Sequence, residues 1–558
     1  MDPLAVLAVL VPSLVPAASE PVSVELALST DPTLQVQVSV TVEGHASGRS
    51  RFALAHEWGG VGPDREDLTA LAATDAEEAA LPIEANGPQA WLVTHAPGAT
   101  IRLTATLQAN RLRDVFQGSQ HYRPILEADL FHTAGHLFLP LPDDRDWESR
   151  RQVRVSWKGF EEVGWRTITS FGAGEDVAAT ASLAELRDAL FVAGPIPVVE
   201  RDLPGGKLLV SVDANRWSFE PDAFADLVAA IVAVEREAMD DQEAGSYWVH
   251  ALAVGPPLER GHQFGGTGLK DAFTLFLQPN VDLSPTSEAH VPVLMLLAHE
   301  AFHAWVGKQI RSELPEGAHK WFFEGFVEHM ARRLLRDGGF LTDEDFARDL
   351  NRVLLEYHTS PARTISAADM GERYWSDGTV QRMGYLRGDV VAMALDHALR
   401  NASDGMETVT DWMRALREES LETGSRFDTE GLLTRIAARV DADVHERLRR
   451  VVVEGEILAL EPDTFGPGFR VELEAREPYD PGFDVRASIA AMRVLGLRAD
   501  SRAATAGLVE GAQIRGLSIE TGRTDREAEV TIQTEGGERT VRYLPVGEPI
   551  ELPVVRVR

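Results

Sequence analysis

Apolar and polar residues alternate along three stretches of the amino-terminal region, residues 22–29, 34–44 and 99–109. A period of two, with many β-branched residues and with Gly, Pro or Asp between the runs, is typical of antiparallel strands that bury one face. We therefore predict an amino-terminal β-sandwich over residues 20–152. The stretch GHLFLPLP, residues 135–142, is expected to form a strand that leads into a linker.

Strands and helices mix in the next part of the chain. Apolar residues recur at helical spacing over residues 221–239, with Pro221 near the start, where its missing N–H costs nothing. The flanking stretches KLLVSVDA (207–214) and YWVHALAV (247–254) are expected to be strands. A glycine-rich segment, residues 261–279, is expected to be a turn that enters another strand.

From residue 287 to about 455 the pattern is mainly helical, and residues 456–558 return to short strands separated by Gly and Pro. The hydrophobic pattern thus predicts a multidomain α+β protein. The domains expected beyond the sandwich are residues 153–456, divided into a β-rich part (153–286) and a helical part (287–456), and residues 457–558.

Composition narrows the class of protein. A chain of 558 residues is too long for one hydrophobic core, which agrees with several domains. Its net charge of −33 repels phosphate backbones and anionic lipid head groups, so nucleic acid is not an expected partner. The chain has no cysteine, so disulfides and thiolate metal sites are excluded, and any metal must bind to His, Asp or Glu.

The amino terminus resembles a secretory signal. Residues 4–15 form a short apolar run interrupted by Pro12, and the Ala-Ala-Ser segment 17–19 supplies the small residues of a cleavage site. We expect residues 1–19 to be the signal peptide of a periplasmic or secreted protein. The alternative is that the run is a buried first strand or an apolar tail, with a cytoplasmic location. No later run approaches the roughly 20 apolar residues of a membrane-spanning helix, so stable membrane insertion is not expected.

Residues 290–311, HVPVLMLLAHEAFHAWVGKQIR, are expected to form a buried helix that carries an H-E-x-x-H motif. At this spacing His299 and His303 project from one face, so two imidazoles can bind one cation at about 2.0–2.1 Å. Glu300 points slightly aside, where it can take a proton from a water molecule. The alternative is a core helix with two satisfied histidines. Burying two His and a Glu within one turn is costly without a shared purpose, which favours the metal site.

A catalytic zinc ion takes three protein ligands and leaves one position open. The expected third ligand is Glu324, on a helix over residues 320–335 that follows a turn at 312–317. A glutamate among inward-facing aromatic residues is costly to bury as a bare anion, and a dication beside it removes that cost. These aromatic residues are Trp321, Phe322, Phe323 and Phe326. Taken alone, Glu324 fits a surface carboxylate equally well, but beside the first helix it predicts one Zn²⁺ per chain.

Three further polar residues lie near this motif in the sequence. Glu328, one turn beyond Glu324, is expected either to accept the distal N–H of a ligand histidine or, as we favour, to lie on the solvated helix surface. His319 and His329 are expected to be surface residues.

HEAFHAWVGKQIR followed by WFFEGFVEHM resembles the glycyl-aminopeptidase family of zinc metallopeptidases, which belongs to the thermolysin-like clan with aminopeptidase N. Residues 385–400 are similar to the family's Tyr-x-Lys-Gly helix, with Arg387 in place of lysine. Residues 444–457 resemble the stretch that closes its helical domain, and residues 503–514, AATAGLVEGAQI, resemble the core of a PDZ module. The resemblance implies a thermolysin-like catalytic domain, built from a mixed sheet and a helical bundle, and a PDZ-like domain at the carboxyl end.

Carried over residue by residue, the resemblance implies zinc on His299, His303 and Glu324, and Glu300 as the general base. It also implies that Tyr385 hydrogen-bonds the oxyanion of the tetrahedral intermediate. That role suits a phenol, which donates a hydrogen bond without titrating near pH 7. The alternative for Tyr385 is an aromatic packing residue at the start of a helix.

The sequence departs from the family at the segment that faces the substrate. Related enzymes carry a glutamate beside a Gly-Gly pair, and it binds the free amino group of the substrate. Here Gly265 and Gly266 are followed by Thr-Gly-Leu-Lys and then Asp271, which is a weak substitute for that glutamate. The glycines are expected to bind a peptide backbone by edge addition, or else to form a plain turn. In the PDZ-like region Ala512 replaces a usual aspartate, so this domain is expected to dock without binding a ligand.

The resulting hypothesis is an aminopeptidase-like zinc metallopeptidase that hydrolyses peptide or protein substrates. One alternative is a zinc-bearing, peptide-binding scaffold of the cell envelope that turns nothing over. Another is an endopeptidase, because the amine-binding glutamate is not evident. The presence of Glu300 and Tyr385 favours the enzyme over the scaffold, since an inactive protein has no need to keep them.

Overall fold

The computed structural model describes residues 19–55, 67–115, 122–212, 216–217, 219–242, 245–258, 262–313, 316–520 and 522–558. The predicted signal peptide lies outside the described residues, apart from Ser19. The chain divides into two compact units, Met1–Ala304 and Trp305–Arg558.

The first unit begins with a six-stranded sheet in the order β14-β11-β1-β2-β7-β4. The alternating stretches predicted from the sequence form three of its strands, β1 (Ser19–Ser29), β2 (Gln35–Glu43) and β7 (Thr100–Gln108). The others are β4 (Leu68–Thr74), β11 (Arg151–Lys158) and β14 (Asp176–Ala181). Because β11 pairs in parallel with β1, with Val24 opposite Val155, this sheet continues past the boundary that we predicted after residue 152.

A four-stranded sheet in the order β10-β3-β6-β5 accompanies the first one. Its strands are β3 (Arg49–Ala53), β5 (Ile83–Ala85), β6 (Ala90–Thr94) and β10 (Leu141–Pro142). Val40 and Leu103 of the six-stranded sheet share one hydrophobic core with Phe52 and Val93 of the four-stranded sheet. Two sheets that share a core through their inner faces make a sandwich-like arrangement, as the alternating pattern predicts.

The prediction of a strand over residues 135–142 is largely wrong. Residues Gly135–Phe138 form a short helix, α1, and only Leu141–Pro142 pair as a strand. All eight residues are buried, so the segment lacks the alternation of a half-exposed strand. A β-carbon on Gly135 would lie 2.3 Å from the carbonyl oxygen of Leu186, which shows how tightly this turn of helix packs.

Two five-stranded sheets complete the first unit. The third sheet has the order β13-β12-β15-β9-β8, with β8 (Ile125–Glu127), β9 (Leu130–Ala134), β12 (Arg166–Thr169), β13 (Gly172–Ala173) and β15 (Leu190–Gly194). The fourth has the order β16-β17-β18-β20-β19, with β16 (Val198–Leu203), β17 (Gly206–Val212), β18 (Tyr247–Ala253), β19 (Phe264–Leu269) and β20 (Ala272–Leu277). Strands β17, β18 and β20 are parallel, whereas β19 runs antiparallel to β20 at the edge.

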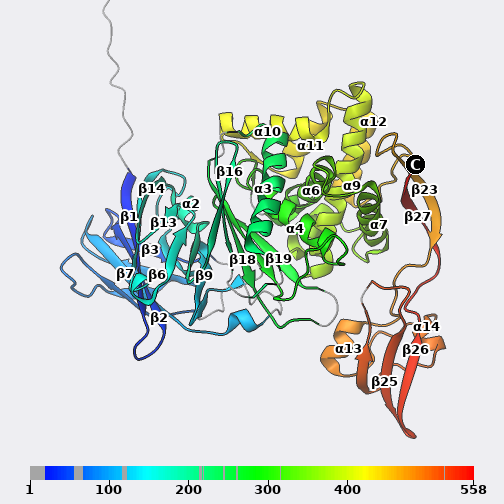
Figure 1. Cartoon of the computed structure of the whole chain (residues 1–558), viewed down its shortest axis with the longest axis horizontal. Coiled ribbons are helices and arrows are strands. Elements are labelled where there is room, and N and C mark those ends of the chain that lie inside the picture. The colour runs from blue at the N-terminus through cyan, green and yellow to red at the C-terminus, as the bar shows by residue number, and fades with distance from the viewer. Residues whose placement is uncertain are drawn as a thin grey trace, which may run out of the picture. The chain divides into compact units, whose positions relative to one another are not determined.

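Two helices pack on the fourth sheet (Figure 1), α3 (Pro221–Ala238) and α4 (His290–Phe302). Helix α3 confirms the predicted helix, and its buried side chains recur at helical spacing, with Phe224, Val228 and Ile231 on one face. The strands predicted around it are confirmed as β17 and β18. The glycine-rich segment, in contrast, forms a strand rather than a turn. Its residues are glycines because α4 lies across the strand too closely for larger side chains.

The second unit is mainly helical up to about residue 455, as predicted. Several of its helices begin at side-chain caps; for example, Thr342 and Asp377 accept hydrogen bonds from the first-turn N–H groups of α7 and α9. The helices are α5 (Lys320–Phe323), α6 (Gly325–Asp337), α7 (Asp343–Thr359), α8 (Ala367–Arg373), α9 (Gly378–Ala402), α10 (Val409–Thr423), α11 (Thr429–Ala437) and α12 (Ala442–Arg449).

Short elements connect these larger ones. Strands β21 (Arg311–Ser312) and β22 (Arg426–Phe427) pair in the second unit, and α2 (Leu183–Arg187) lies in the first. The short helical turns are η1 (Leu112–Asp114), η3 (Glu161–Val163), η4 (Glu316–His319) and the π-helical η5 (Arg450–Glu454).

The carboxy-terminal region of the second unit returns to strands. Strands β25 (Ala528–Thr534) and β26 (Gly537–Tyr543) form a hairpin, which β24 (Ile514–Ser518) joins in a three-stranded sheet. Two short helices flank it, α13 (Val485–Ala491) and α14 (Arg502–Thr505). A separate pair, β23 (Phe469–Arg476) and β27 (Ile550–Val557), packs along α7. There the Asn351 amide donates to the carbonyl of Val555 at 3.0 Å and accepts from its N–H at 2.7 Å.

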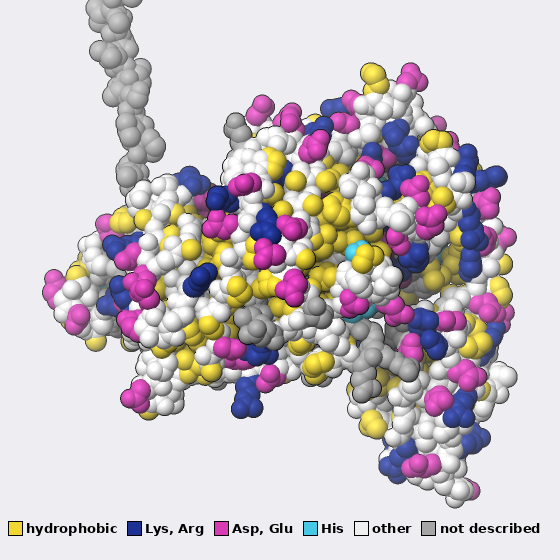
Figure 2. Space-filling model, in the orientation of Figure 1, with side chains coloured by type: hydrophobic (Ala, Val, Ile, Leu, Met, Phe, Trp, Pro, Cys, Tyr) yellow, Lys and Arg dark blue, Asp and Glu magenta, His cyan; other side chains and the backbone are white. Residues whose placement is uncertain are grey.

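The surface carries charges of both signs. On the face shown in Figure 2, Asp and Glu side chains are interspersed with Lys and Arg. On the six-stranded sheet, Arg102 pairs with Glu25 at 2.9 Å and Arg154 pairs with Asp176 at 3.1 Å. Exposed pairs of this kind add little stability. Among the described residues, no helix is both long and apolar enough to cross a membrane.

Candidate active site

The H-E-x-x-H motif lies at the end of α4, which is shorter than predicted. The helix ends at Phe302 rather than near residue 311. Gly307 has φ +101°, and its N–H donates to the carbonyl of Ile310 at 2.8 Å in a tight turn that stops the helix. His303 still has helical backbone angles, so it remains one turn beyond His299. The predicted pairing of the two histidines thus survives a helix end that the apolar pattern did not reveal.

Each of the two imidazoles turns its Nε2 atom toward the other. Nε2 of His299 and Nε2 of His303 are 3.2 Å apart, and the rings meet edge to face with centroids 4.8 Å apart. Two nitrogens bound to one tetrahedral zinc ion at about 2.0–2.1 Å would be about 3.3 Å apart. The spacing of the two nitrogens therefore fits a shared cation.

Glu324 lies at the junction of α5 and α6, between the last residue of one helix and the first of the other. Its aromatic neighbours are buried as predicted, with Trp321 and Phe326 at most 1% exposed. One ligand atom from each of His299, His303 and Glu324 lies within 4.8 Å of the others, so the three side chains together could hold a metal ion. Two imidazoles and one carboxylate are the donor set of many catalytic zinc sites.

Lys320 contacts this site, and the sequence analysis missed it. Its ammonium donates a hydrogen bond to Oε1 of Glu324 at 2.9 Å, with only 14% of the Lys320 side chain and 9% of the Glu324 side chain exposed. The same ammonium lies 5.6 Å from the ring centroid of Trp375. The i, i+4 spacing of Lys320 and Glu324 on the predicted helix was the available signal. The contact holds one carboxylate oxygen of the expected ligand in a fixed direction.

Glu300 lies directly against the glycines of edge strand β19. A β-carbon on Gly266 would come within 2.4 Å of Cγ of Glu300, and one on Gly268 would lie 3.0 Å from Cβ of His303. The carbonyl of Gly266 accepts a hydrogen bond from the Tyr122 hydroxyl at 2.9 Å. The two glycines thus leave room for α4 to cross the strand closely, which explains the segment better than a turn does.

Asp271 does not share this position. It lies at φ +47° in the turn between β19 and β20, more than about 10 Å along the strand from Gly266. Its carboxylate pairs with Lys270 at 2.6 Å. Asp271 therefore lies away from the glycine pair, whereas the amine-binding glutamate of related enzymes lies beside it.

Tyr385 is a half-buried residue of α9, three positions before Gly388. Helix α9 meets the segment that holds Glu324 at very close range. A β-carbon on Gly388 would lie 1.5 Å from the carbonyl oxygen of Trp321, and one on Gly325 would lie 2.3 Å from Cα of Gly388. The two glycines thus bring the backbones that carry Glu324 and Tyr385 into contact.

The histidines predicted to be on the surface are buried, so that expectation was wrong. His319 is 8% exposed, and its Nδ1 is 2.9 Å from Oγ1 of Thr429. His329 is 7% exposed, and its Nδ1 is 3.7 Å from Oδ1 of Asp389. Both partners come from distant parts of the sequence, which local patterns do not connect.

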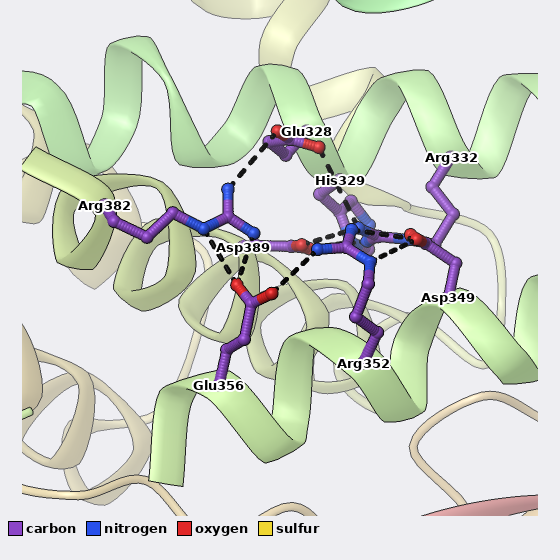
Figure 3. Close-up of polar contacts among 8 residues, drawn as sticks. All are labelled: Glu328, His329, Arg332, Asp349, Arg352, Glu356, Arg382 and Asp389. Atoms are coloured by element: carbon purple, nitrogen blue, oxygen red, sulfur yellow. Dashed lines mark hydrogen bonds and ion pairs between the residues drawn. The ribbon is translucent and has the colours of Figure 1, made fainter. Parts of the chain in front are cut away.

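The solvated surface position that we favoured for Glu328 is also wrong, because its side chain is largely buried. Its carboxylate oxygens lie 4.0 Å from Arg332 and 3.9 Å from Arg382, at 18% exposure (Figure 3). Glu328 thus belongs to a group of charged residues between α6, α7 and α9.

Tyr247, at the start of β18, is a second residue near Glu300 that sequence reasoning missed. Burial raises the pKa of its hydroxyl well above 10, and the charges of Glu235 and Glu300 raise it further. Glu235 is itself buried on α3, and burial raises the pKa of its carboxyl group. The Tyr247 hydroxyl therefore keeps its proton at neutral pH.

Comparison with known proteins agrees with this geometry. Residues 292–391, which include both histidines, Glu324 and Tyr385, match the M61 glycyl aminopeptidase family. No curated protein matches the chain by sequence.

Solved structures are similar to the chain. A crystal structure of an aminopeptidase N family protein from Idiomarina loihiensis is similar with a TM-score of 0.73 and 16% identity, over 96% of this chain and 98% of that one. An M1 zinc metallopeptidase from Deinococcus radiodurans is similar over 79% of this chain and 94% of its own, with a TM-score of 0.48 and 18% identity. At such identities the first likeness shows a common mixed α+β architecture.

Proposed function

Because the chain carries a domain of the M61 glycyl aminopeptidase family over residues 292–391, we propose that it is a zinc-dependent metallopeptidase. In this proposal His299, His303 and Glu324 hold one zinc ion per chain, and peptides or proteins are the substrates. The observation that carries the proposal is the convergence of one ligand atom from each of these side chains within 4.8 Å.

The donor set suits the chemistry of peptide hydrolysis. When bound, a zinc ion polarises the scissile carbonyl and lowers the pKa of a water molecule by several units. Two neutral imidazoles and one carboxylate leave a net positive charge at the site, which favours a developing oxyanion.

Glu300 is the proposed general base. It is 7% exposed and lies against Gly266, so its carboxylate has little freedom to turn away. In the proposed reaction Glu300 takes a proton from the attacking water and passes it to the nitrogen of the leaving amine. That nitrogen must be protonated, because an amide anion is a very poor leaving group.

Tyr385 is the proposed donor to the oxyanion of the tetrahedral intermediate. The family resemblance supports this role, and the neutral phenol suits it because the proton stays on the oxygen near pH 7. Its place one turn before Gly388 ties the position of the Tyr385 backbone to that of the Glu324 backbone.

The structure also favours a second candidate, an endopeptidase. Strand β19, with the sequence FGGTGL, has no carboxylate along its length, and Asp271 lies beyond its end. A substrate's free amino group therefore has no partner on this strand of the kind that related aminopeptidases use. The ratio of kcat/KM for free and amino-blocked versions of one peptide separates the two, since an aminopeptidase cleaves only the free form.

We also propose that residues 457–558 form a PDZ-like domain and that the amino terminus directs export to the periplasm. The resemblance of residues 503–514 to a PDZ core and the sheet β24-β25-β26 support the first proposal. The apolar run at residues 4–15 supports the second. Together these two proposals describe a peptidase of the cell envelope.

A peptide-library assay tests the enzyme against the scaffold. Wild-type protein is expected to cleave members of the library, whereas Glu300→Gln and chelator-treated protein are expected to be nearly inactive. Equal, negligible turnover by all three would favour the zinc-bearing scaffold.

A further inference from the structure

The helices that carry Glu324 and Tyr385 are joined by buried charges some distance from the metal ligands. We propose that Arg332 is a positioning residue that, through Asp349 and Asp389, fixes α6 against α7 and α9 and thereby aligns Glu324 with Tyr385. This inference rests on the proposed function, because it concerns the geometry of that site.

Arg332 makes a two-sided bridge (Figure 3). Its Nε donates to Oδ2 of Asp349 at 2.6 Å, and its Nη1 donates to Oδ1 of Asp389 at 2.9 Å. Nη2 lies 2.8 Å from Oδ2 of Asp389 as an ion pair without hydrogen-bond geometry, so both nitrogens at this end of the guanidinium face that carboxylate. The side chain of Arg332 is 1% exposed. A planar guanidinium held at both edges fixes direction as well as distance.

The surrounding charges hold the two aspartates in their ionised form. Burial favours the neutral acid, but the charges of Arg332 and Arg352 outweigh it and lower the pKa of Asp349 to about 2. Burial likewise opposes ionisation of Asp389, yet Arg332 and His329 lower its pKa. Arg352 bonds Asp349 at 2.8 Å, and Glu356 joins Arg352 to Arg382. The bridge therefore stays charged at neutral pH.

The contact between the helices near the site explains why such a bridge is needed. Gly325 and Gly388 meet backbone to backbone, so no side chains interlock there to prevent one helix from sliding along the other. Arg332 is two turns beyond Gly325, and its side chain reaches back toward the helix start to Asp389, the residue after Gly388. The bridge thus fixes the register of the two helices about two turns beyond Glu324 on α6 and about one turn beyond Tyr385 on α9.

A purely stabilising core would not need these charges. Buried ion pairs recover little more than their own desolvation cost, and well-packed apolar residues stabilise at least as well. What the bridge adds is a single allowed alignment of three helices. Its predicted effect therefore appears in the metal site as well as in the stability of the fold.

The test compares Arg332→Met with Arg348→Met, a control in which an exposed pair with Asp345 is lost from α7. Zinc affinity is measured by competition with a chelator, together with kcat and the melting temperature. We expect Arg332→Met to bind zinc about 10- to 100-fold more weakly and to lose kcat to a similar extent, with Arg348→Met unchanged. Wild-type zinc affinity and kcat in Arg332→Met, with only a lower melting temperature, would overturn the proposal.

If Arg332→Met does not fold, the charge-free variant Arg332→Met/Asp349→Asn/Asp389→Asn takes its place. It is expected to fold and to bind zinc more weakly than wild type, and wild-type zinc affinity in it would overturn the proposal. The zinc-affinity and melting measurements need no peptidase turnover, so an inactive wild type would contradict the proposed function alone.

A distance measurement decides the case in which wild type binds no zinc. Because the chain has no cysteine, Asp337→Cys on α6 and Asn401→Cys on α9 give two unique sites for spin labels. The distribution of label distances is expected to shift or broaden when Arg332→Met, or the charge-free variant, is added. An unchanged distribution would overturn the proposal.

Discussion

Gly266 and Glu300 are in direct contact, since a β-carbon on the glycine would lie 2.4 Å from Cγ and 2.6 Å from Oε1 of the glutamate. In the proposed function, the strand whose edge would bind a substrate thus also sets the position of the proposed base. A peptide that paired with that edge would lie next to Glu300, because the strand's register sets its position.

Replacement of Gly266 by alanine tests this contact. Because the clashing atoms belong to a side chain, the strand is expected to keep its place and Glu300 to move aside. We expect kcat to fall about 100-fold, as a misplacement of about 1 Å can cause, while zinc content stays at the wild-type level. Steady-state kinetics and metal analysis check this. Gly378→Ala is the control, since a β-carbon there meets nothing within 4 Å, and equal activity of both variants would contradict the assignment.

Glu300→Gln separates catalysis from metal binding. The amide keeps the size of the side chain but cannot accept a proton from water near neutral pH, so kcat is expected to fall by about 100- to 10,000-fold. Zinc stoichiometry is expected to stay unchanged because Glu300 is not one of the three converging ligands. Glu344→Gln, at an exposed position of α7, is the matched control. A Glu300→Gln variant as active as this control would exclude Glu300 as the base.

Gly388→Ala is expected to destabilise the second unit. Alanine normally stabilises a helix interior relative to glycine by about 1 kcal/mol, so helix propensity alone would predict a gain. Here the added carbon would lie 1.5 Å from a backbone carbonyl oxygen, which cannot yield without moving a helix. We expect a loss of about 1–3 kcal/mol or more in the free energy of unfolding. Denaturant unfolding measures it, and a stability equal to wild type would show that the helices do not meet at this point.

The stability of the first unit is expected to depend on pH through His250. Burial, reinforced by the charge of Arg113 and opposed by a bond with Ser211, lowers the pKa of His250 to about 3. The unfolded chain binds that proton near pH 6.5, so between pH 6.5 and 3 it holds more protons than the folded chain. The free energy of unfolding should therefore fall with falling pH, by up to about 1.4 kcal/mol per unit from this group.

Unfolding measured at several pH values checks that dependence. His250→Gln removes the titrating group and is expected to show a shallower fall of stability between pH 6.5 and 3. Nδ1 of His250 is hydrogen-bonded to Oγ of Ser211 at 2.8 Å. Because the variant loses this bond, it is also expected to be less stable at neutral pH. Identical slopes in wild type and variant would show that His250 does not control the response.

The sequence predicted the features that depend on local spacing. The i, i+4 pair His299 and His303 and the aromatic residues around Glu324 were recognisable because one helical turn brings them together. The end of α4 was not, because Trp305, Val306 and Ile310 continue the apolar pattern yet are buried in a turn.

Contacts between distant segments lay beyond what local patterns reveal. The fit of Gly266 under Glu300 depends on how α4 crosses β19, and the burial of His329 depends on Asp389, sixty residues away. The continuation of the first sheet into β11 is a further case, since a parallel partner from residue 151 onward leaves no mark in β1 itself.

The central claim is that two imidazoles and the Glu324 carboxylate bind one metal ion, and zinc content measured after dialysis against a weak chelator tests it most directly. Wild-type protein is expected to retain one zinc ion per chain, and Glu324→Ala to retain almost none while its circular dichroism stays that of a folded protein. Equal zinc retention by Glu324→Ala and wild type, or none in either, would contradict the account.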